Sequence, residues 1–478
     1  MKLSKNARYA IMLFAALLFI YQLTAFNVTV SNDSCTNIEQ IAAGDIFRRS
    51  AHFGFNFLGV LFFKLLSIIG IGSPVFSTQF MLAFFSAAGS VALYFIAFKR
   101  FNKTGAALLT VVIYAFSSNV WRFSLQSEYL VLVPSLTLIA IACWLYDKGV
   151  LAGISFALAL LTSPFALLGL PLVLAFPNKK PLKKIASTAA GFVVIYGFVS
   201  FFTFEETLQG EWSYNLVFTY YQKSILSIKP LRVAAIWAYG YLRSFHILIP
   251  LLLWSLWRSF GTNRSWFFIT VLGVLVHLPA AIPEIRYGAY QMTFYPILAL
   301  HIAGLYAEST SKTIQRLNVA VLLFVLVNIY IIFEERHFQH QLADTYEQMQ
   351  SDKTIADSST VLMYQATKPL NTIYAPRLNG VAIFSAYQEK LTENLERFEL
   401  PDYARIGSQQ QYVYLIESGT SMPDDRLKKI ASTFVKNQGA KLKGFGLEKV
   451  KSMYPNSTLE LLPEFALPVY RIKTETKP

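Results

Sequence analysis

The sequence predicts a polytopic α-helical membrane protein that ends in a small α/β domain, and three observations lead to this fold class. Only 15% of the 478 residues are charged and 54% are hydrophobic, whereas soluble domains have about 25% charged residues. Apolar runs of the roughly 20 residues that cross a bilayer core recur through residues 1–333. Residues 334–478 lack such runs and carry as many basic as acidic side chains. The pattern excludes a soluble enzyme and a nucleic-acid-binding protein, although the net charge is +14.

The apolar runs predict the membrane helices in chain order. Residues 150–177 form one long run that the Thr162-Ser163-Pro164 step interrupts, and proline tends to end a helix because it lacks a backbone N–H. We therefore expect two short helices packed as a hairpin in this run, and about eleven transmembrane helices in all. The other expected helices cover residues 8–26, 75–98, 104–118, 128–146, 185–203, 233–257, 266–283, 289–307 and 314–333.

Positive charge tests this count, because cytoplasmic loops of membrane proteins collect lysine and arginine. With a cytoplasmic N-terminus, the inner loops carry a net charge of about +13 and the outer loops about +1. Two helices in 150–177 keep the lysines of 179–184 on the inner side, and an odd total places residues 334–478 outside. The first helix has no small-x-small cleavage site after Ile20, which favours a retained helix over a signal peptide. We expect an integral protein of a bacterial cytoplasmic (inner) membrane.

Residues 334–478 show the patterning of a soluble extracytoplasmic α/β domain. A polar helix near 334–356 leads into strand-like runs at 360–364, 381–385 and 412–416, followed by a helix near 423–437 and a strand near 466–472. There is no glycine-rich phosphate loop in this region. The two cysteines of the chain, Cys35 and Cys143, support neither a disulfide framework nor a zinc site.

The predicted first outer loop, residues 27–74, holds the main group of candidate functional residues. It begins with Asp33 and continues through His52 and Lys64, and ionisable groups beside a bilayer are functional candidates because they are costly there. Two stretches, 37–47 and 53–71, are amphipathic, as in helices that lie in the membrane interface. Asp33 could act as a general base. The alternative is that it caps a helix that starts near Thr36.

Four further candidates lie in or beside the other outer loops. Arg122 and Glu128 belong to the second loop, and Glu128 at a helix start is also favoured by the helix dipole alone. Arg286 and Tyr287 form part of a very short third loop, where Arg286 either grips a phosphate or reaches lipid headgroups.

Arg243 lies inside the run 233–257. It either faces a polar cavity or, if its helix starts near Tyr241, lies at the interface. Neither reading is excluded by the sequence.

Three segments carry a resemblance to a known superfamily. They read SSNVWRFSLQSEYLVLVPSL at 117–136, GISFALALLTSPFALLGLPLVL at 153–174, and RYGAYQMTFYPILALHIAGLY at 286–306. With the acid that opens the long outer loop, they resemble the GT-C superfamily of integral-membrane glycosyltransferases, in the branch of the protein O-mannosyltransferases and the lipid A aminoarabinose transferase. The resemblance implies a polyprenyl-phosphate-linked sugar donor and reaction on the extracytoplasmic side.

The resemblance also assigns roles to residues. Asp33 matches the first-loop aspartate that is the proposed catalytic base, and His52 falls where the family usually has His-Pro, here with Phe53 in place of proline. Arg243 and Arg286 become ligands for the lipid-linked phosphate, with His52 and Lys64 as further donor-binding candidates. Arg122, Glu128 and Tyr287 are the candidates for binding the remaining substrate.

These residues predict a glycosyltransferase that moves a sugar from a polyprenyl-phosphate donor to a protein, lipid or envelope-glycan acceptor. Such transfer needs a base for the nucleophile and positive groups for the departing phosphate. We expect no cofactor, because the lipid-linked sugar is a substrate, and no metal ligand set, while divalent-metal dependence stays open. The alternatives are a transporter or flippase, for which inverted repeats are expected but none is visible, and a non-catalytic envelope-assembly scaffold.

Overall fold

The structure is a computed structural model that describes residues 5–28, 32–46, 52–169, 181–209, 230–277, 289–352, 355, 359–364, 379–384, 412–416, 457–466 and 469–474. Its contacts divide the chain into two compact units. One unit, called here the membrane unit, comprises residues 1–27 and 37–332, and the other comprises residues 28–36 and 333–478. The two units are described separately below.

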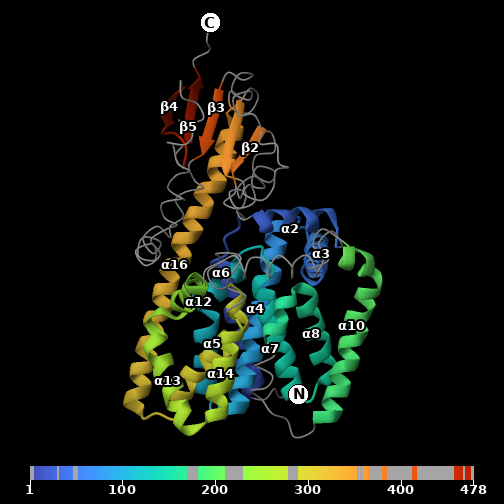
Figure 1. Cartoon of the computed structure of the whole chain (residues 1–478), viewed down its shortest axis with the longest axis vertical. Helices are drawn as coiled ribbons and strands as arrows, with labels where there is room; N and C mark the ends of the chain where they lie inside the picture. Colours follow the sequence, from blue (N-terminus) through green and yellow to red (C-terminus); the bar gives the residue numbers. More distant parts are fainter. Residues whose placement is uncertain are drawn as a thin grey trace. The chain divides into compact units, whose positions relative to one another are not determined.

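The membrane unit is a bundle of apolar helices (Figure 1). Its helices and helical turns are α1 (Lys5–Leu23), α3 (Phe53–Ile68), α4 (Pro74–Phe101), α5 (Thr104–Ala115), α6 (Ser118–Leu125), η2 (Tyr129–Val131), α7 (Leu132–Leu145), α8 (Gly149–Thr162), η3 (Pro164–Gly169), α10 (Pro181–Gln209), α12 (Pro230–Phe245), η4 (His246–Leu248), α13 (Ile249–Thr262), α14 (Arg264–Val276), η6 (Ala289–Thr293) and α15 (Tyr295–Ala307). Two further helices, α2 (Asn32–Ala43) and α16 (Ser311–Ser351), contain residues of both units.

Length and apolar composition fit membrane crossing for α1, α4 and α16 among the described residues. A fourth crossing is obtained when α5 and α6, which are bent by 64° at their junction, are taken as one broken span. Shorter apolar helices include α3, α8, α14 and α15. The total of about eleven transmembrane helices stays a prediction.

The amphipathic stretches of the first outer loop form helices, with boundaries that differ from those expected. Residues 37–43 of the first stretch belong to α2, which begins at Asn32 and ends at Ala43, and the stretch 53–71 forms α3, which ends at Ile68. Gly44 and Gly70 follow these helices with φ of 73° and 86°, a left-handed conformation that glycine adopts without steric cost. The alternative in which Asp33 caps a helix that starts near Thr36 is wrong, because α2 begins at Asn32 and Asp33 lies within its first turn.

The expected single helix over 233–257 is also wrong. The structure breaks it into α12 and α13, which are separated by the 3₁₀ turn η4 at His246–Leu248. Pro250 lies at the start of α13, where its missing N–H costs no intrahelical bond, whereas in a helix interior it would break one. The break places Arg243 in the last turn of α12.

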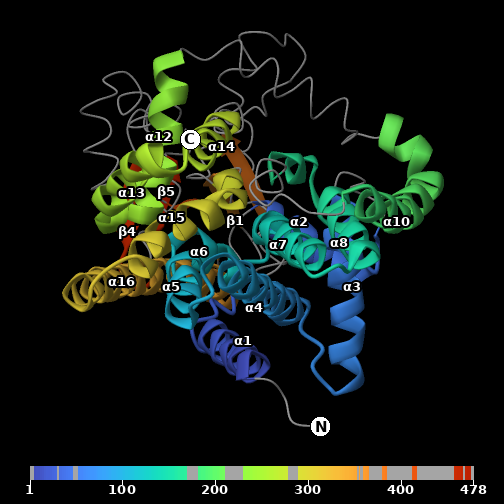
Figure 2. The ribbon, with the colours of Figure 1, turned by 90° about the horizontal axis from the view of Figure 1, so that it is seen from below.

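The run 150–177 begins as predicted, since α8 ends at Thr162 and Pro164 opens η3. The second helix expected there, between Pro164 and residue 177, is described only as the 3₁₀ turn η3 (Pro164–Gly169), and residues 170–177 lie outside the described residues. Helix α8 lies between α7 and α10 (Figures 1 and 2). A Cβ at Gly153 would lie 2.0 Å from the Thr188 carbonyl oxygen, and one at Gly191 would lie 2.2 Å from that of Val150. These glycines allow the two backbones to touch, as small residues do at membrane helix interfaces.

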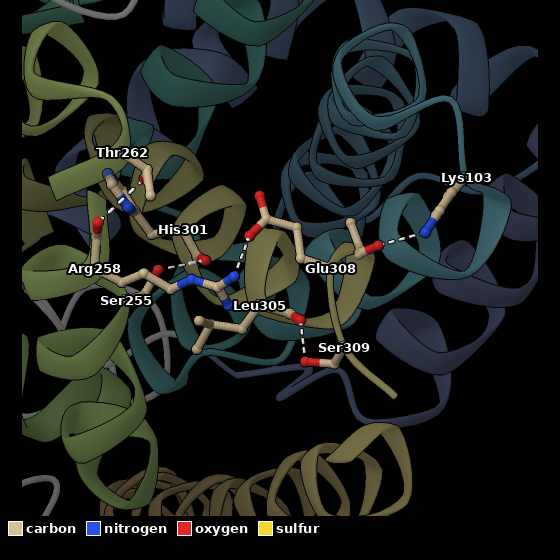
Figure 3. A network of polar contacts seen from close by, with 9 residues as sticks. Lys103, Ser255, Arg258, Thr262, His301, Leu305, Glu308 and Ser309 are labelled. Atoms are coloured by element: carbon tan, nitrogen blue, oxygen red, sulfur yellow. Dashed lines mark hydrogen bonds and ion pairs between the residues drawn. The ribbon is translucent and has the colours of Figure 1, made fainter. Parts of the chain in front are cut away.

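Near the end of α15, two basic residues that the charge pattern assigns to inner loops, Lys103 and Arg258, belong to one network of polar contacts (Figure 3). Lys103 Nζ donates to the carbonyl oxygen of Ala307 at the end of α15, so it satisfies a carbonyl of the helix terminus. Arg258 and Glu308 form an ion pair of 2.9 Å. The Arg100 guanidinium lies 3.7 Å from the ring centroid of Trp266. Assignment of this end to the cytoplasm is a prediction from the charge pattern.

The second unit contains a five-stranded sheet in the order β2-β1-β3-β5-β4. Its strands are β1 (Ser359–Tyr364), β2 (Asn379–Phe384), β3 (Tyr412–Ile416), β4 (Ser457–Leu462) and β5 (Val469–Thr474). Strand β1 pairs in parallel with β2 and β3, whereas β5 pairs antiparallel with β3 and β4. Strand β4 was not anticipated from the sequence. The helix expected near 423–437 lies outside the described residues, so the α/β assignment stays a prediction.

Candidate functional site

Four short segments that are far apart in the sequence meet within the membrane unit. They are the start of α3 and the 3₁₀ turns η2, η3 and η6; η6 contacts both η2 and η3. Each segment contributes an aromatic ring or an imidazole to one cluster, which consists of His52, Tyr129, Phe165 and Tyr290. We call this group the aromatic cluster.

His52 is the residue immediately before α3, and two contacts hold its ring. Its Nδ1 lies 2.9 Å from the carbonyl oxygen of Thr162, the last residue of α8. Its ring stacks on Tyr129 with a centroid separation of 3.9 Å and an interplanar angle of 25°. Since Nδ1 can donate only when protonated, this contact favours a tautomer or charge state with a proton on Nδ1.

Tyr129 connects His52 to the far side of the cluster. Its hydroxyl lies 3.2 Å from the Tyr290 hydroxyl, in a contact where either oxygen can donate. The Tyr290 ring lies 4.1 Å from that of Phe165. Tyr290 is absent from the residues predicted from sequence. The signal that could have indicated it is its position four residues after Arg286, in the segment RYGAYQM.

Glu128 precedes Tyr129 and is the N-cap residue of η2, as its predicted place at a helix start requires. Only 4% of its surface is exposed. A carboxylate that is this buried needs polar or dipolar stabilisation, and the backbone N–H groups that open η2 and α7 supply a positive dipole end. Glu128 is therefore a buried residue next in the chain to Tyr129 of the aromatic cluster.

Arg122 and Arg243 belong to two helices that contact each other, α6 and α12. Ser118 Oγ of α6 donates to the Arg243 carbonyl oxygen at 3.3 Å. Both arginine side chains are half-buried. Arg243 lies in the last turn of α12. Its half-buried side chain fits either of the two places considered for it, a polar cavity or the membrane interface.

The Tyr295 hydroxyl ties this arginine-bearing end of α12 to α6 and α15. It receives hydrogen bonds from Ser244 Oγ at 2.7 Å and Asn119 Nδ2 at 3.0 Å, and it donates to the Gly240 carbonyl oxygen at 3.2 Å. Gly240 and Ser244 flank Arg243 along α12. Tyr295 and Asn119 were not singled out in the sequence, because their partners lie in other helices.

Of the remaining predicted residues, Lys64 is the one with a described side chain, and it does not join the aromatic cluster. Lys64 is exposed on α3 among the exposed Leu61 and Leu65, and it lies twelve residues after His52, or about 18 Å along a helix. Asp33 is placed in the first turn of α2, and its side chain lies outside the described parts. Arg286 and Tyr287 lie outside the described residues.

Among the described residues, no group of three or more His, Cys, Asp or Glu side chains could hold a metal ion. This finding covers only part of the predicted outer loops. The absence of a metal ligand set in the whole chain therefore stays a prediction from the sequence.

Comparison with known proteins identifies the fold. No protein-family model matches the chain, and no curated protein matches it in sequence. The crystal structure of ArnT from Cupriavidus metallidurans bound to undecaprenyl phosphate matches with a TM-score of 0.59 at 11% identity, over 96% of this chain and 97% of that chain. The same protein in its apo state matches with a TM-score of 0.58 at 8% identity, over 98% of each chain. This chain therefore shares the overall fold of ArnT, in agreement with the resemblance of its sequence segments.

Proposed function

We propose that this protein is a glycosyltransferase that moves a sugar from a polyprenyl-phosphate-linked donor to an acceptor at the extracytoplasmic face of a bacterial inner membrane. The observation that carries the proposal is the fold shared over nearly the whole chain with ArnT, which has been crystallised with undecaprenyl phosphate. A lipid-linked donor reaches its enzyme through the bilayer. This agrees with the lack of a glycine-rich nucleotide-phosphate loop in the sequence.

The chemistry that we propose is a single displacement with inversion at the anomeric carbon. The acceptor O–H or N–H loses its proton to the Asp33 carboxylate while the acceptor atom bonds to the anomeric carbon. The bond from that carbon to the phosphate oxygen breaks, and its electron pair leaves with the phosphate. Positive side chains stabilise this charge. We assign that role to Arg243 and Arg286, with His52 and Lys64 as further donor-binding residues.

Recognition of the sugar and acceptor is assigned to Arg122, Glu128 and Tyr287. The burial of Glu128 beside Tyr129 supports this assignment, because a buried carboxylate discriminates strongly between a partner with a hydroxyl and one without. The stacked rings of His52 and Tyr129 add a flat surface of the type on which ligands can pack.

The test is sugar transfer and lipid co-purification by the full-length protein. Membranes labelled with radioactive sugar precursors supply the donor, and native mass spectrometry of the purified protein detects bound lipid phosphates. We expect Asp33→Asn to lower transfer at least about 100-fold, the scale of general-base catalysis, while lipid phosphate still co-purifies. Arg243→Gln should reduce co-purification. Glu39→Gln is the matched control, because Glu39 is exposed on the same helix as Asp33.

Two results would contradict different parts of the proposal. Undiminished transfer by Asp33→Asn would remove Asp33 as the base but leave the reaction class intact. A wild-type protein that transfers no sugar and carries no polyprenyl phosphate would refute the glycosyltransferase itself. A transporter would move a lipid-linked sugar across the vesicle membrane without cleaving it, and this too is measurable in the same preparation.

A further inference from the structure

Hydrogen bonds within the membrane unit hold the chain shortly before and shortly after the segment that carries Asp33. Residues 28–36 continue directly from Asn27, and they are followed directly by Asn37 and the rest of α2. Buried carboxamides fix the chain shortly before and shortly after this segment. The first is Gln79 of α4, and the second is the pair Gln40 of α2 and Asn56 of α3.

The attachment before the segment begins where α1 ends. Trp121 Nε1 donates to Thr24 Oγ1 at 3.1 Å, and the Asn27 backbone N–H donates to Gln79 Oε1 at 3.0 Å. Gln79 is buried, with 2% of its surface exposed, so water competes little for its oxygen. Asn27 has a φ of 59°, a left-handed conformation that asparagine tolerates better than most residues. The chain therefore leaves α1 through a turn that Gln79 holds.

The attachment after the segment joins α2 to α3. Asn56 Nδ2 donates to Gln40 Oε1 at 3.1 Å, and both residues are buried. Beside this bond, a Cβ at Gly59 would lie 2.4 Å from the Ile41 side chain, so α2 and α3 touch at a glycine. Helix α3 in turn packs against α4 and α8. Gln40 lies two helical turns after Asp33 in α2, so the bond acts on the same helix that carries the proposed base.

We propose that Gln79 and the Gln40–Asn56 pair are positioning residues, which hold the chain just before and just after the Asp33 segment and act on the position of the base through the helix that it shares with Gln40. This inference rests on the proposed function, because it takes Asp33 as the base of the transfer reaction. None of the three carboxamides touches the reacting atoms in this account. A displacement of a catalytic group by about 1 Å can cost about 100-fold in rate, which is why two attachments matter.

The experiment compares variants of the full-length protein in lipid nanodiscs. Gln79→Met and Gln40→Met keep the side-chain size and remove the acceptor oxygen. Gln79→Glu and Gln40→Glu keep an acceptor oxygen in either protonation state. Gln315→Met is the matched control, since Gln315 is exposed on α16. Three quantities are measured: hydrogen exchange of residues 24–43, the dissociation constant for undecaprenyl phosphate, and the rate of sugar transfer from labelled membranes.

We expect each methionine variant to speed exchange of residues 24–43 about tenfold, because loss of a buried hydrogen bond lowers the free energy of local opening. Transfer should fall about tenfold, while the dissociation constant for undecaprenyl phosphate stays within about twofold. The glutamate variants should restore exchange and transfer to within about threefold of wild type. The control should match wild type in all three quantities.

Three results would overturn the inference: unchanged exchange in the methionine variants, faster exchange with unchanged transfer, or a loss of transfer that the glutamate variants share. A general loss of structure would weaken lipid binding as well, and it would also count against a positioning role. A wild-type protein without transfer activity would refute the proposed function itself. The two failures can be told apart, because the positioning inference is tested only in a preparation in which the wild-type protein transfers sugar.

Discussion

Replacing Tyr295 by phenylalanine tests whether the arginine-bearing end of α12 is held in place from α6 and α15. The Tyr295 side chain is fully buried at the start of α15. Its hydroxyl makes three hydrogen bonds, to Asn119, Ser244 and the Gly240 carbonyl oxygen. The substitution removes all three bonds and leaves the ring in place.

The expected cost follows from these three bonds. Interhelical hydrogen bonds in membrane proteins average about 0.6 kcal/mol, so the loss should lower stability by about 2 kcal/mol. A second effect follows from position, because two of the three partners flank Arg243. If Arg243 binds the lipid phosphate, its contact should weaken by about 1 kcal/mol, which raises the dissociation constant for undecaprenyl phosphate about fivefold.

Two assays measure these effects on purified protein in nanodiscs. Thermal unfolding should show a Tm lower by about 2 °C or more, and lipid titration should show the weaker binding. Tyr306→Phe is the matched control in the same helix, because the Tyr306 hydroxyl makes no hydrogen bond within the described part of the chain. Equal Tm and equal lipid affinity for Tyr295→Phe and wild type would refute the reasoning.

Three other substitutions give sharp expectations. Tyr129→Phe removes the 3.2 Å contact with the Tyr290 hydroxyl but keeps the ring that stacks on His52. Sugar transfer from labelled membranes should fall about threefold to tenfold, while stability changes by less than about 1 kcal/mol. Unchanged transfer would show that this contact of the aromatic cluster has no part in the reaction. Gly191→Leu places a side chain within 2.2 Å of a carbonyl oxygen of α8; thermal unfolding should show a loss of about 3 kcal/mol, and a wild-type Tm would contradict the close approach of α8 and α10. Glu308→Gln removes the ion pair with Arg258, in which the Arg258 side chain is 40% exposed and the Glu308 side chain is 61% exposed. The Tm of this variant should stay close to that of wild type, because exposed ion pairs contribute about 0–1 kcal/mol to stability. A large drop in Tm would indicate that the pair is less solvated than its exposure suggests.

The helices were predictable where the signal is local. Runs such as 75–98 and 314–333 lie within α4 and α16, because a helix that crosses lipid must be apolar along its length. The break between α12 and α13 also has a local cause, Pro250, but the surrounding hydrophobicity conceals it. Helix α2 begins five residues before its predicted start because Asn32 to Thr36 are polar and continue the helix without apolar periodicity.

The candidate site was predictable only in part. His52 and Glu128 could be identified because an ionisable residue next to an apolar helix is conspicuous. Tyr290 could not, because 161 residues separate it from Tyr129 and short 3₁₀ turns have no periodic pattern that reveals their packing. Residue type alone placed Lys64 with the phosphate ligands, and the structure puts it on an exposed face of α3.

The sequence by itself determined the membrane class, the order of the apolar helices and the expected orientation, because hydrophobicity and charge act on each segment separately. It also supplied the likeness to GT-C enzymes, and the chain shares the fold of ArnT. Only the tertiary structure decided which side chains meet. The stack of His52 on Tyr129, the three bonds of Tyr295 and the bond from Asn27 to Gln79 join elements distant in sequence, and the Gln40–Asn56 bond joins two separate helices. Such contacts depend on how helices pack against one another, and no single segment contains that information.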